Sequence, residues 1–531
     1  MVRALHIVVA LGIWGQLTPL RSQTRVPKLT QSYRGNFFDI NWVDKLDRNG
    51  QPFADYSSFS AKEHLEHLVK MNADSLLVFA MPISGYMLYD SKIAERHPNL
   101  KYDYLAEIIR LGHQRGIAME LYLPTMYNDR LVQRNPSWGV RNPDGSLYQS
   151  LFGGYHPDPN SPAADWYVKI INELVPAYRA EALFLDGISF LRYGQSEFTV
   201  KRFLEDMGRA YPKSVQEDPD WRSTVRWEVT QMENFWLKLK AASKLRDPGI
   251  EVTLDEPGPY IQMPGVPGEF VPVPPHVNTL TDYAYTEAGP RGEFSTWMRG
   301  IMHPKPFRVT FLNRHSIVDL ARIDDLRAHV GRSLAVGGRI YHSDRTSVEG
   351  KPNAHSTSVW GEVFREIKEK EPYLAGTEPV KYAAIVSSEP TMLYRGRMDL
   401  SSHANEMLGA MRMLDALHVQ YDVVPDWNLD PQILKNYRLV ILPNTACMSD
   451  EQVRAIRQYV RDGGAIIATA ESSLFDATGK PRPDFALADV LGLRIDEEVS
   501  DAIQSGDRKS PIYLQPRSQA HPIFQGSRRR S

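Results

Sequence analysis

Asp186 follows a short apolar run that has the pattern of a buried strand. The segment Glu181–Phe190 reads EALFLDGISF, in which apolar residues lead into the acid and Gly187 follows it. Such a run predicts a buried strand that ends in a carboxylate and a turn. In a barrel of eight parallel strands, catalytic groups come from the C-terminal strand ends and the loops after them. Asp186 is therefore a candidate catalytic carboxylate; the alternative interpretation is that Asp-Gly only forms a turn.

Two glutamates end other predicted strands and could act together with Asp186. Glu256 lies in the stretch LDEPGPY, and Glu287 lies in DYAYTEAGP. A retaining glycoside hydrolase needs a nucleophile and an acid/base carboxyl group about 5 Å apart. We favour Asp186 as the nucleophile and Glu287 as the acid/base, with Glu256 as a rival for the second role. Either glutamate could equally be an ordinary acid of a surface loop.

Further polar and aromatic residues follow the other predicted strands. Sugars present hydroxyl groups and apolar C–H faces, so a pocket that combines polar and aromatic side chains suits them. The same residue types also occur in loops only to form turns. The predicted substrate-binding residues are Asp39, Trp42, Glu120, Tyr122, Tyr127, His156, Asn160, Asn313, His315 and His342.

The sequence predicts neither a metal site nor a cofactor site. It contains no HExxH motif, its histidines are scattered, and Cys447 is its only cysteine, so a thiolate cluster is excluded. Cys447 follows an apolar strand-like run, but it lacks the flanking glycines of a nucleophile elbow. We interpret it as a buried structural thiol.

Strand-like and helix-like segments alternate over residues 30–375, which predicts a (β/α)8 TIM barrel. A helix is expected between most successive strands, for example at Ser60–Asn72, Leu105–Arg115 and Trp166–Tyr178. The predicted strands besides Glu181–Phe190 are Asn36–Trp42, Asp74–Met81, Ile117–Pro124, Ile250–Glu256, Asn278–Glu287, Phe307–Leu312 and Ser333–Tyr341.

A second α/β unit is predicted over residues 380–500. Short apolar strands alternate with helices there, as in an open flavodoxin-like (glutamine-amidotransferase-like) sheet. No glycine-rich phosphate loop follows its first strand, so nucleotide binding is not indicated. The pattern fades over residues 501–531, which we interpret as an irregular or truncated C-terminus. The predicted strands are Tyr382–Ser387, Gln420–Pro425, Leu439–Pro443 and Ala465–Ala470.

Composition and the N-terminus bear on partners and on location. The formal net charge is -2, which gives no reason to expect nucleic acid as a partner. Residues 1–23 have the layout of a signal peptide, with Arg3 before a short apolar run. An exported chain with a single cysteine has no intramolecular disulfide, which favours a bacterial periplasmic or secreted protein that has no membrane association after signal cleavage.

Three stretches of the barrel resemble a known family. ALFLDGISF, the helix-to-strand junction His113–Tyr122 and the NSP element at Asn160 are similar to α-L-fucosidase-like hypothetical glycosyl hydrolases, which are relatives of glycoside hydrolase families 29 and 151. In that group the nucleophile is an Asp at the end of strand four, and Asp186 matches it. The position of the acid/base varies among the relatives, so the resemblance does not choose between Glu287 and Glu256.

The second unit resembles the trimerisation domain of family-42 β-galactosidases. That resemblance implies a non-catalytic domain and a possible homo-trimer. Family-42 enzymes use two glutamates, one of them in an Asn-Glu pair at strand four, whereas this chain has Asp186-Gly187 there. The difference disfavours the family-42 mechanism.

These observations together predict an exported, retaining, exo-acting glycosidase of the α-L-fucosidase type. Its substrate would be an oligosaccharide, a polysaccharide or a glycoconjugate. Two alternatives stay open at this point: a carbohydrate-binding barrel without activity, and a β-galactosidase-like glycosidase.

Overall fold

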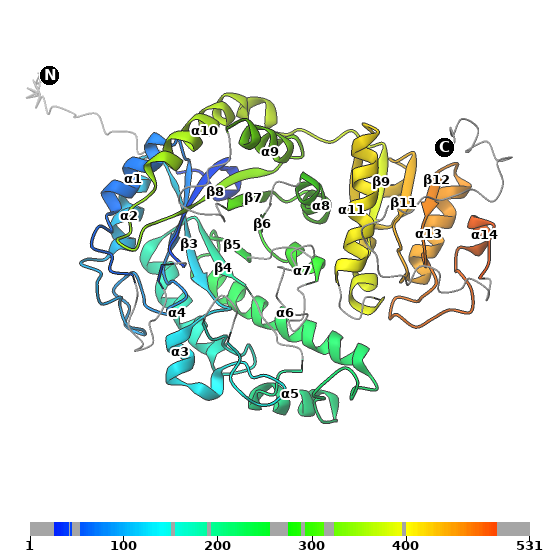
Figure 1. Ribbon diagram of the computed structural model, residues 1–531, viewed down its shortest axis with the longest axis horizontal. Helices are drawn as coiled ribbons and strands as arrows, with labels where there is room; N and C mark the ends of the chain where they lie inside the picture. The colour runs from blue at the N-terminus through cyan, green and yellow to red at the C-terminus, as the bar shows by residue number, and fades with distance from the viewer. Residues whose placement is uncertain are drawn as a thin grey trace, which may run out of the picture.

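The structure is a computed structural model and consists of two α/β parts (Figure 1). The predicted signal peptide and residues 501–531 lie outside the part of the chain that it describes. The described residues are 26–41, 43–44, 54–149, 154–187, 193–254, 274–287, 292–312, 323–395 and 400–495.

The first part is a nearly closed barrel of parallel strands in the order β5-β4-β3-β2-β1-β8-β7-β6. The ends of the series meet where the Asp282 amide donates to the Val252 carbonyl, at 3.0 Å. This order confirms the predicted (β/α)8 barrel. The strands are β1 (Arg34–Asp39), β2 (Ser75–Phe79), β3 (Ala118–Pro124), β4 (Ala182–Asp186), β5 (Glu251–Leu254), β6 (Ala284–Glu287), β7 (Phe307–Leu312) and β8 (Arg339–Arg345).

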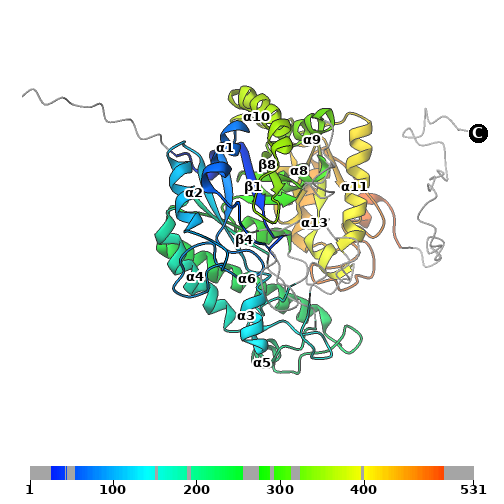
Figure 2. The ribbon, with the colours of Figure 1, turned by 60° about the vertical axis from the view of Figure 1, so that its left-hand side comes forward.

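Helices surround the strands, and Figure 2 shows α1, α2 and α10 on the outside of the barrel. Several begin where a side chain caps them: Ser60 accepts from the Glu63 amide, and Asp103 accepts from the Ala106 amide. The helices are α1 (Ala61–Lys70), α2 (Tyr104–His113), α3 (Asp129–Arg134), α4 (Ala163–Tyr178), α5 (Glu197–Met207), α6 (Trp221–Arg246), α7 (Pro275–Thr279), α8 (Gly292–Met302), α9 (Ile323–Ala335) and α10 (Ala354–Leu374).

An aromatic layer fills the middle of the barrel. The rings of Phe79 and Tyr122 lie 4.1 Å apart, those of Phe37 and Phe79 lie 5.1 Å apart, and those of Phe184 and Tyr285 lie 4.8 Å apart. The rings come from five different strands. They meet inside the barrel because alternate residues of each strand point to its interior. These rings therefore pack together beneath the C-terminal strand ends.

Two of the predicted strands have different bounds in the structure. Asn278 lies in helix α7, so β6 begins six residues later than predicted, at Ala284. Ser333 lies in α9, and β8 runs from Arg339 to Arg345. The helix-to-strand change comes just after Gly337, which has a left-handed φ of 84°. The apolar residues at the end of α9 had made the strand look longer and earlier.

The second part is a four-stranded parallel sheet in the order β10-β9-β11-β12, which confirms the flavodoxin-like prediction. Cys447 follows β11 and is buried, and this burial raises the pKa of its thiol to about 12. These properties agree with a structural thiol. The elements are β9 (Ala383–Ser387), α11 (Leu400–Ala416), β10 (Tyr421–Pro425), α12 (Pro431–Leu434), β11 (Leu439–Leu442), α13 (Asp450–Arg461), β12 (Ala465–Ala468) and α14 (Ala488–Leu491).

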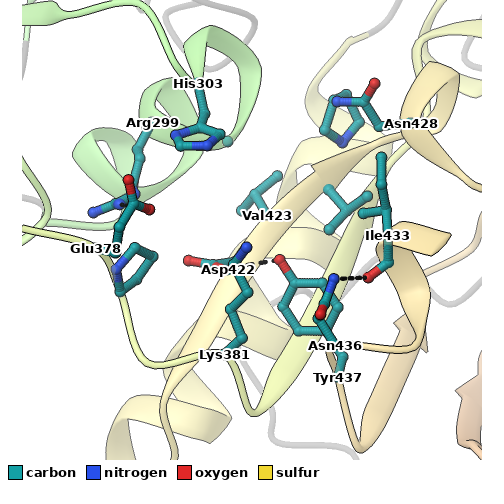
Figure 3. A pocket seen from close by; sticks show the side chains of 14 residues that line it. Arg299, His303, Glu378, Lys381, Asp422, Val423, Asn428, Ile433, Asn436 and Tyr437 are labelled. Atoms are coloured by element: carbon teal, nitrogen blue, oxygen red, sulfur yellow. Dashed lines mark hydrogen bonds and ion pairs between the residues drawn. The ribbon is translucent and has the colours of Figure 1, made fainter.

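Helix α8 joins the two parts, because it packs against the outer edge of β10. A Cβ at Gly300 would lie 2.2 Å from the Val423 carbonyl oxygen, so only glycine permits this approach. The Trp297 indole N–H donates to the Ser387 hydroxyl at 3.1 Å. A cleft of about 230 Å³ opens beside Gly300 and Val423, and Asp422 is among the residues that line it (Figure 3).

A histidine also links the two parts. The ring of His276, in α7, contacts Glu233 of α6 through Nε2 and Glu389 of the second part through Nδ1, the latter at 2.7 Å. The His276 backbone amide donates to the same Glu389 carboxylate at 2.9 Å. Burial alone would lower the pKa of His276, but the hydrogen bonds to the two glutamates outweigh burial and raise it to about 10.

No described helix has both the length and the apolar character that a bilayer span requires.

Replacing His276 by Ala is expected to lower the free energy of unfolding at pH 7 by about 2 kcal/mol, because two carboxylates lose their shared donor. The raised pKa means that the stabilisation is fully present below pH 6.5, declines above it and is lost as the pH passes about 10. Denaturant unfolding of both proteins between pH 6 and pH 10.5 measures this difference.

His355→Ala, at an exposed position on α10, is the control and should behave like the parent at every pH. A constant difference between the His276 variant and the parent across this range would contradict the charged link.

Candidate active site

Asp186 is the last residue of β4 and lies at the C-terminal end of the barrel. Its backbone carbonyl accepts from the amides of Thr125 and Met126, at 2.9 and 3.1 Å, so the end of β4 is tied to the segment that follows β3. Gly187 turns the chain with a φ of 74°, and a Cβ there would lie 2.7 Å from the Met126 side chain. The Asp-Gly sequence thus fixes the backbone that carries the carboxylate.

The Asp186 carboxylate accepts a hydrogen bond from the Tyr122 hydroxyl, through Oδ2. Tyr122 stands on β3 and is 2% exposed, while Asp186 is 9% exposed. Burial, and then the charge of Asp186, raise the pKa of Tyr122 well above its usual value. The phenol therefore keeps its proton at neutral pH and acts as a donor to the carboxylate.

Asn41 and Asp39 extend this network from the end of β1. The Asn41 amide nitrogen donates to the Tyr122 hydroxyl at 2.6 Å. The backbone amide of Asn41 donates to Asp39 Oδ1 at 3.1 Å. The structure thus brings three predicted site residues together, Asp39, Tyr122 and Asp186. Sequence reasoning missed Asn41, although it stands directly before the predicted residue Trp42.

The long connection between β3 and α4 contains Tyr127, His156 and Asn160. The Tyr127 ring lies edge-on to His156 at 4.6 Å, and burial lowers the pKa of His156 to about 3, so its imidazole is neutral. The Asn160 side chain donates to Thr199 of α5 at 3.1 Å. These contacts stabilise the connection. Of the three residues, Tyr127 comes directly after Met126, whose backbone amide donates to Asp186.

Glu120 has a structural place rather than one at the strand ends. It lies inside the barrel below the aromatic layer, and the guanidinium of Arg308 on β7 contacts both of its carboxylate oxygens. The Tyr283 hydroxyl also donates to it. Both Glu120 and Arg308 are buried. The oxygens of Glu120 are thus engaged in a buried ion pair near the start of β3, below the strand ends. Its predicted contact with substrate stays a prediction.

His342 also lies away from the site. It sits within β8 rather than after it and points outward, where its ring stacks on Trp360 of α10 at 4.5 Å. Its Nε2 contacts the Ser356 hydroxyl at 2.6 Å, and burial lowers its pKa to about 3. Strand alternation thus directs His342 to the outer face of the barrel, away from Asp186. Its predicted contact with substrate stays a prediction.

Glu287 is the last residue of β6, and its backbone pairs with Thr310 of β7. It therefore ends its strand at the same, C-terminal edge of the barrel as Asp186. The rival acid Glu256 lies outside the described residues, as do Trp42, Asn313 and His315. Their predicted roles stay predictions.

In the described part of the chain, no three His, Cys, Asp or Glu side chains are grouped as a metal site would require. The site offers a buried carboxylate at the open end of a barrel, which accepts a hydrogen bond from a phenol; an amide in turn donates to that phenol. Such a carboxylate can act as a nucleophile or stabilise positive charge.

Comparison with family models gives two matches. Residues 60–188 match the family model described as hypothetical glycosyl hydrolase 6, a segment that contains β2 to β4 and Asp186. Residues 395–510 match the β-galactosidase trimerisation domain. A search of curated proteins gave no match.

Solved structures share the architecture. The α-L-fucosidase isoenzyme 2 from Paenibacillus thiaminolyticus has 20% identity and a TM-score of 0.65, over 84% of this chain and 65% of its own. The β-galactosidase from Rahnella sp. R3 has 16% identity and a TM-score of 0.66, over 88% of this chain and 76% of its own. That from Bacillus circulans sp. alkalophilus has 14% identity and a TM-score of 0.66, over 87% and 74%.

The present chain thus spans about two thirds of the fucosidase's length. The fold is that of glycoside hydrolases related to fucosidases and β-galactosidases.

Removing either partner of the buried Glu120–Arg308 pair is expected to destabilise the barrel. Glu120→Gln or Arg308→Met alone should lower the free energy of unfolding by about 3–5 kcal/mol, because one charge is left without its partner inside the barrel. Denaturant unfolding measures each loss.

The double variant with both substitutions serves as the control and should lose less than the sum of the single variants. Losses that simply add would show that the two side chains do not act as a pair.

Proposed function

We propose that the protein is a retaining glycoside hydrolase in which Asp186 is the nucleophile. The observation that carries the proposal is the place of Asp186 at the C-terminal end of β4, buried and bound by Tyr122, within the segment that matches a glycosyl hydrolase family model. Barrel enzymes place their reacting groups at this edge. The hydrogen bond keeps the carboxylate in one orientation, which a nucleophile requires.

Glu287 is the proposed acid/base. It ends β6 at the same edge of the barrel, so both groups belong to the rim formed by the C-terminal strand ends. In the first step an oxygen of Asp186 bonds to the anomeric carbon while the glycosidic C–O bond breaks and Glu287 protonates the leaving oxygen. In the second step Glu287 takes a proton from water, which attacks the anomeric carbon and releases Asp186.

The substrate class is proposed from the fold and from the resemblance of the β4 stretch to fucosidases. An exo-acting enzyme that removes a terminal α-L-fucosyl unit from an oligosaccharide or glycoconjugate is the first candidate. A β-galactoside is the second, because several solved structures with this architecture, including the two described above, are β-galactosidases. We further propose that the second part mediates self-association, since it matches the trimerisation domain model, and that the protein is exported.

Asp186→Ala is expected to lower kcat/KM for the best activated aryl glycoside by about 10³-fold or more, because the covalent step is lost. Screening aryl α-L-fucosides and β-D-galactosides identifies that substrate, and NMR of the product reports whether the anomeric configuration is retained. Azide should restore turnover to Asp186→Gly with inverted product.

Near-normal turnover by Asp186→Ala would overturn the nucleophile assignment. Sugar binding without turnover by the parent protein would favour a carbohydrate-binding barrel instead.

Glu287→Gln and Glu256→Gln form a matched pair for the acid/base role. The true acid/base variant is expected to lose about 10²-fold or more on substrates with poor leaving groups and much less on activated ones, because only the former need protonation. The rates of both variants on a series of aryl leaving groups measure this dependence. Dependence in Glu256→Gln alone would transfer the role to Glu256.

A further inference from the structure

The orientation of the Asn41 side chain is fixed by a backbone group. The Ile83 amide, in the segment after β2, donates to Asn41 Oδ1 at 3.2 Å. A backbone N–H can only donate, so the oxygen of the Asn41 amide faces Ile83 and its nitrogen faces the other way. That nitrogen donates to the Tyr122 hydroxyl at 2.6 Å.

The orientation of the Tyr122 hydroxyl follows from this contact. The hydroxyl oxygen accepts from Asn41, so its single proton is directed to its other partner, Asp186 Oδ2. Burial, together with the neighbouring Asp186 charge, raises the pKa of the phenol, which keeps that proton in place. Three hydrogen bonds in series, which begin at the Ile83 backbone amide, thus fix which group donates to the candidate nucleophile.

We propose that Asn41 is a positioning residue, which acts through Tyr122 to keep a hydrogen-bond donor on one oxygen of Asp186. The inference rests on the proposed function.

The donor is most useful when the ester is hydrolysed. Water attacks the anomeric carbon, the bond from that carbon to Asp186 breaks, and its electron pair returns to the carboxylate. Negative charge develops on both carboxylate oxygens in this step, and the Tyr122 hydroxyl stabilises the share on Oδ2. Attack by Asp186 on the substrate instead consumes this charge, so the same donor assists that step less.

A double-mutant cycle tests whether Asn41 acts through Tyr122. The variants are Asn41→Ala, Tyr122→Phe and the double variant, and the phenyl ring preserves the packing against Phe79. With an activated aryl glycoside, whose turnover is limited by ester hydrolysis, Tyr122→Phe is expected to lower kcat by about 10²-fold. Asn41→Ala should lower it by about 10-fold, and the double variant should match Tyr122→Phe.

The kinetic pattern separates positioning from a general structural role. Slower ester hydrolysis lowers kcat and KM together, so kcat/KM changes less than kcat. Intact-protein mass spectrometry should then show more glycosyl ester in Tyr122→Phe than in the parent during turnover. Asn99→Ala is the control, because Asn99 also donates an amide hydrogen bond, to the Ala54 carbonyl, without touching Tyr122; it should leave kcat unchanged.

Two outcomes would overturn the inference. Losses from Asn41→Ala and Tyr122→Phe that multiply in the double variant would mean that Asn41 does not act through Tyr122. Loss of kcat/KM at unchanged kcat would mean that the donor serves the first step. Asp186→Ala, assayed with the same substrate, distinguishes failure of this inference from failure of the proposed function. Turnover that survives this change, or a parent protein without turnover, refutes the role of Asp186 as the nucleophile.

Discussion

The alternation of side chains along parallel strands is the constraint on which the site depends. Every second residue of a barrel strand points inward, and only the last inward residue of a strand reaches the open end. Asp186 meets both conditions on β4. His342 fails the first and Glu120 the second, although both are polar residues on buried strands. Residue type selects candidates, but position along the strand decides which of them can face a ligand.

The layers beneath Asp186 give its carboxylate a firm base. The buried pair of Glu120 and Arg308 spans the barrel from β3 to β7, and the aromatic layer lies between this pair and the strand ends. Tyr122 belongs to that aromatic layer and also donates to Asp186. One side chain thus contributes to packing and to the site, so the orientation of the carboxylate depends on the packing of the core.

The sequence was sufficient for the barrel, for the second sheet and for the position of Asp186. Apolar runs as long as a strand and the Asp-Gly turn are local signals, and the eight strands follow one another in regular order. The register of β8 was less accessible, because the end of α9 is as apolar as a strand and only Gly337 separates them. That shift alone misplaced His342 at a strand end.

Contacts between residues distant in sequence were out of reach. Nothing near Glu120 indicates that Arg308, 188 residues later, will neutralise it. Asn41 likewise becomes recognisable only when β1, β2 and β3 lie side by side in the barrel. Its partners are Ile83, in the segment after β2, and Tyr122, on β3. Strand ends can be counted from a sequence, but which of them meet depends on the shear of the barrel.

The contact of Gly300 with Val423 has a consequence for assembly. An open sheet has two edges, and each exposes unpaired backbone groups on which another chain could add a strand. Helix α8 lies over the β10 edge, so among the four described strands of the second sheet only β12 keeps an edge away from the barrel. Copies of the chain that met through this sheet could therefore pair edge to edge once. They could not continue into an endless ribbon, because such growth needs two open edges on every subunit.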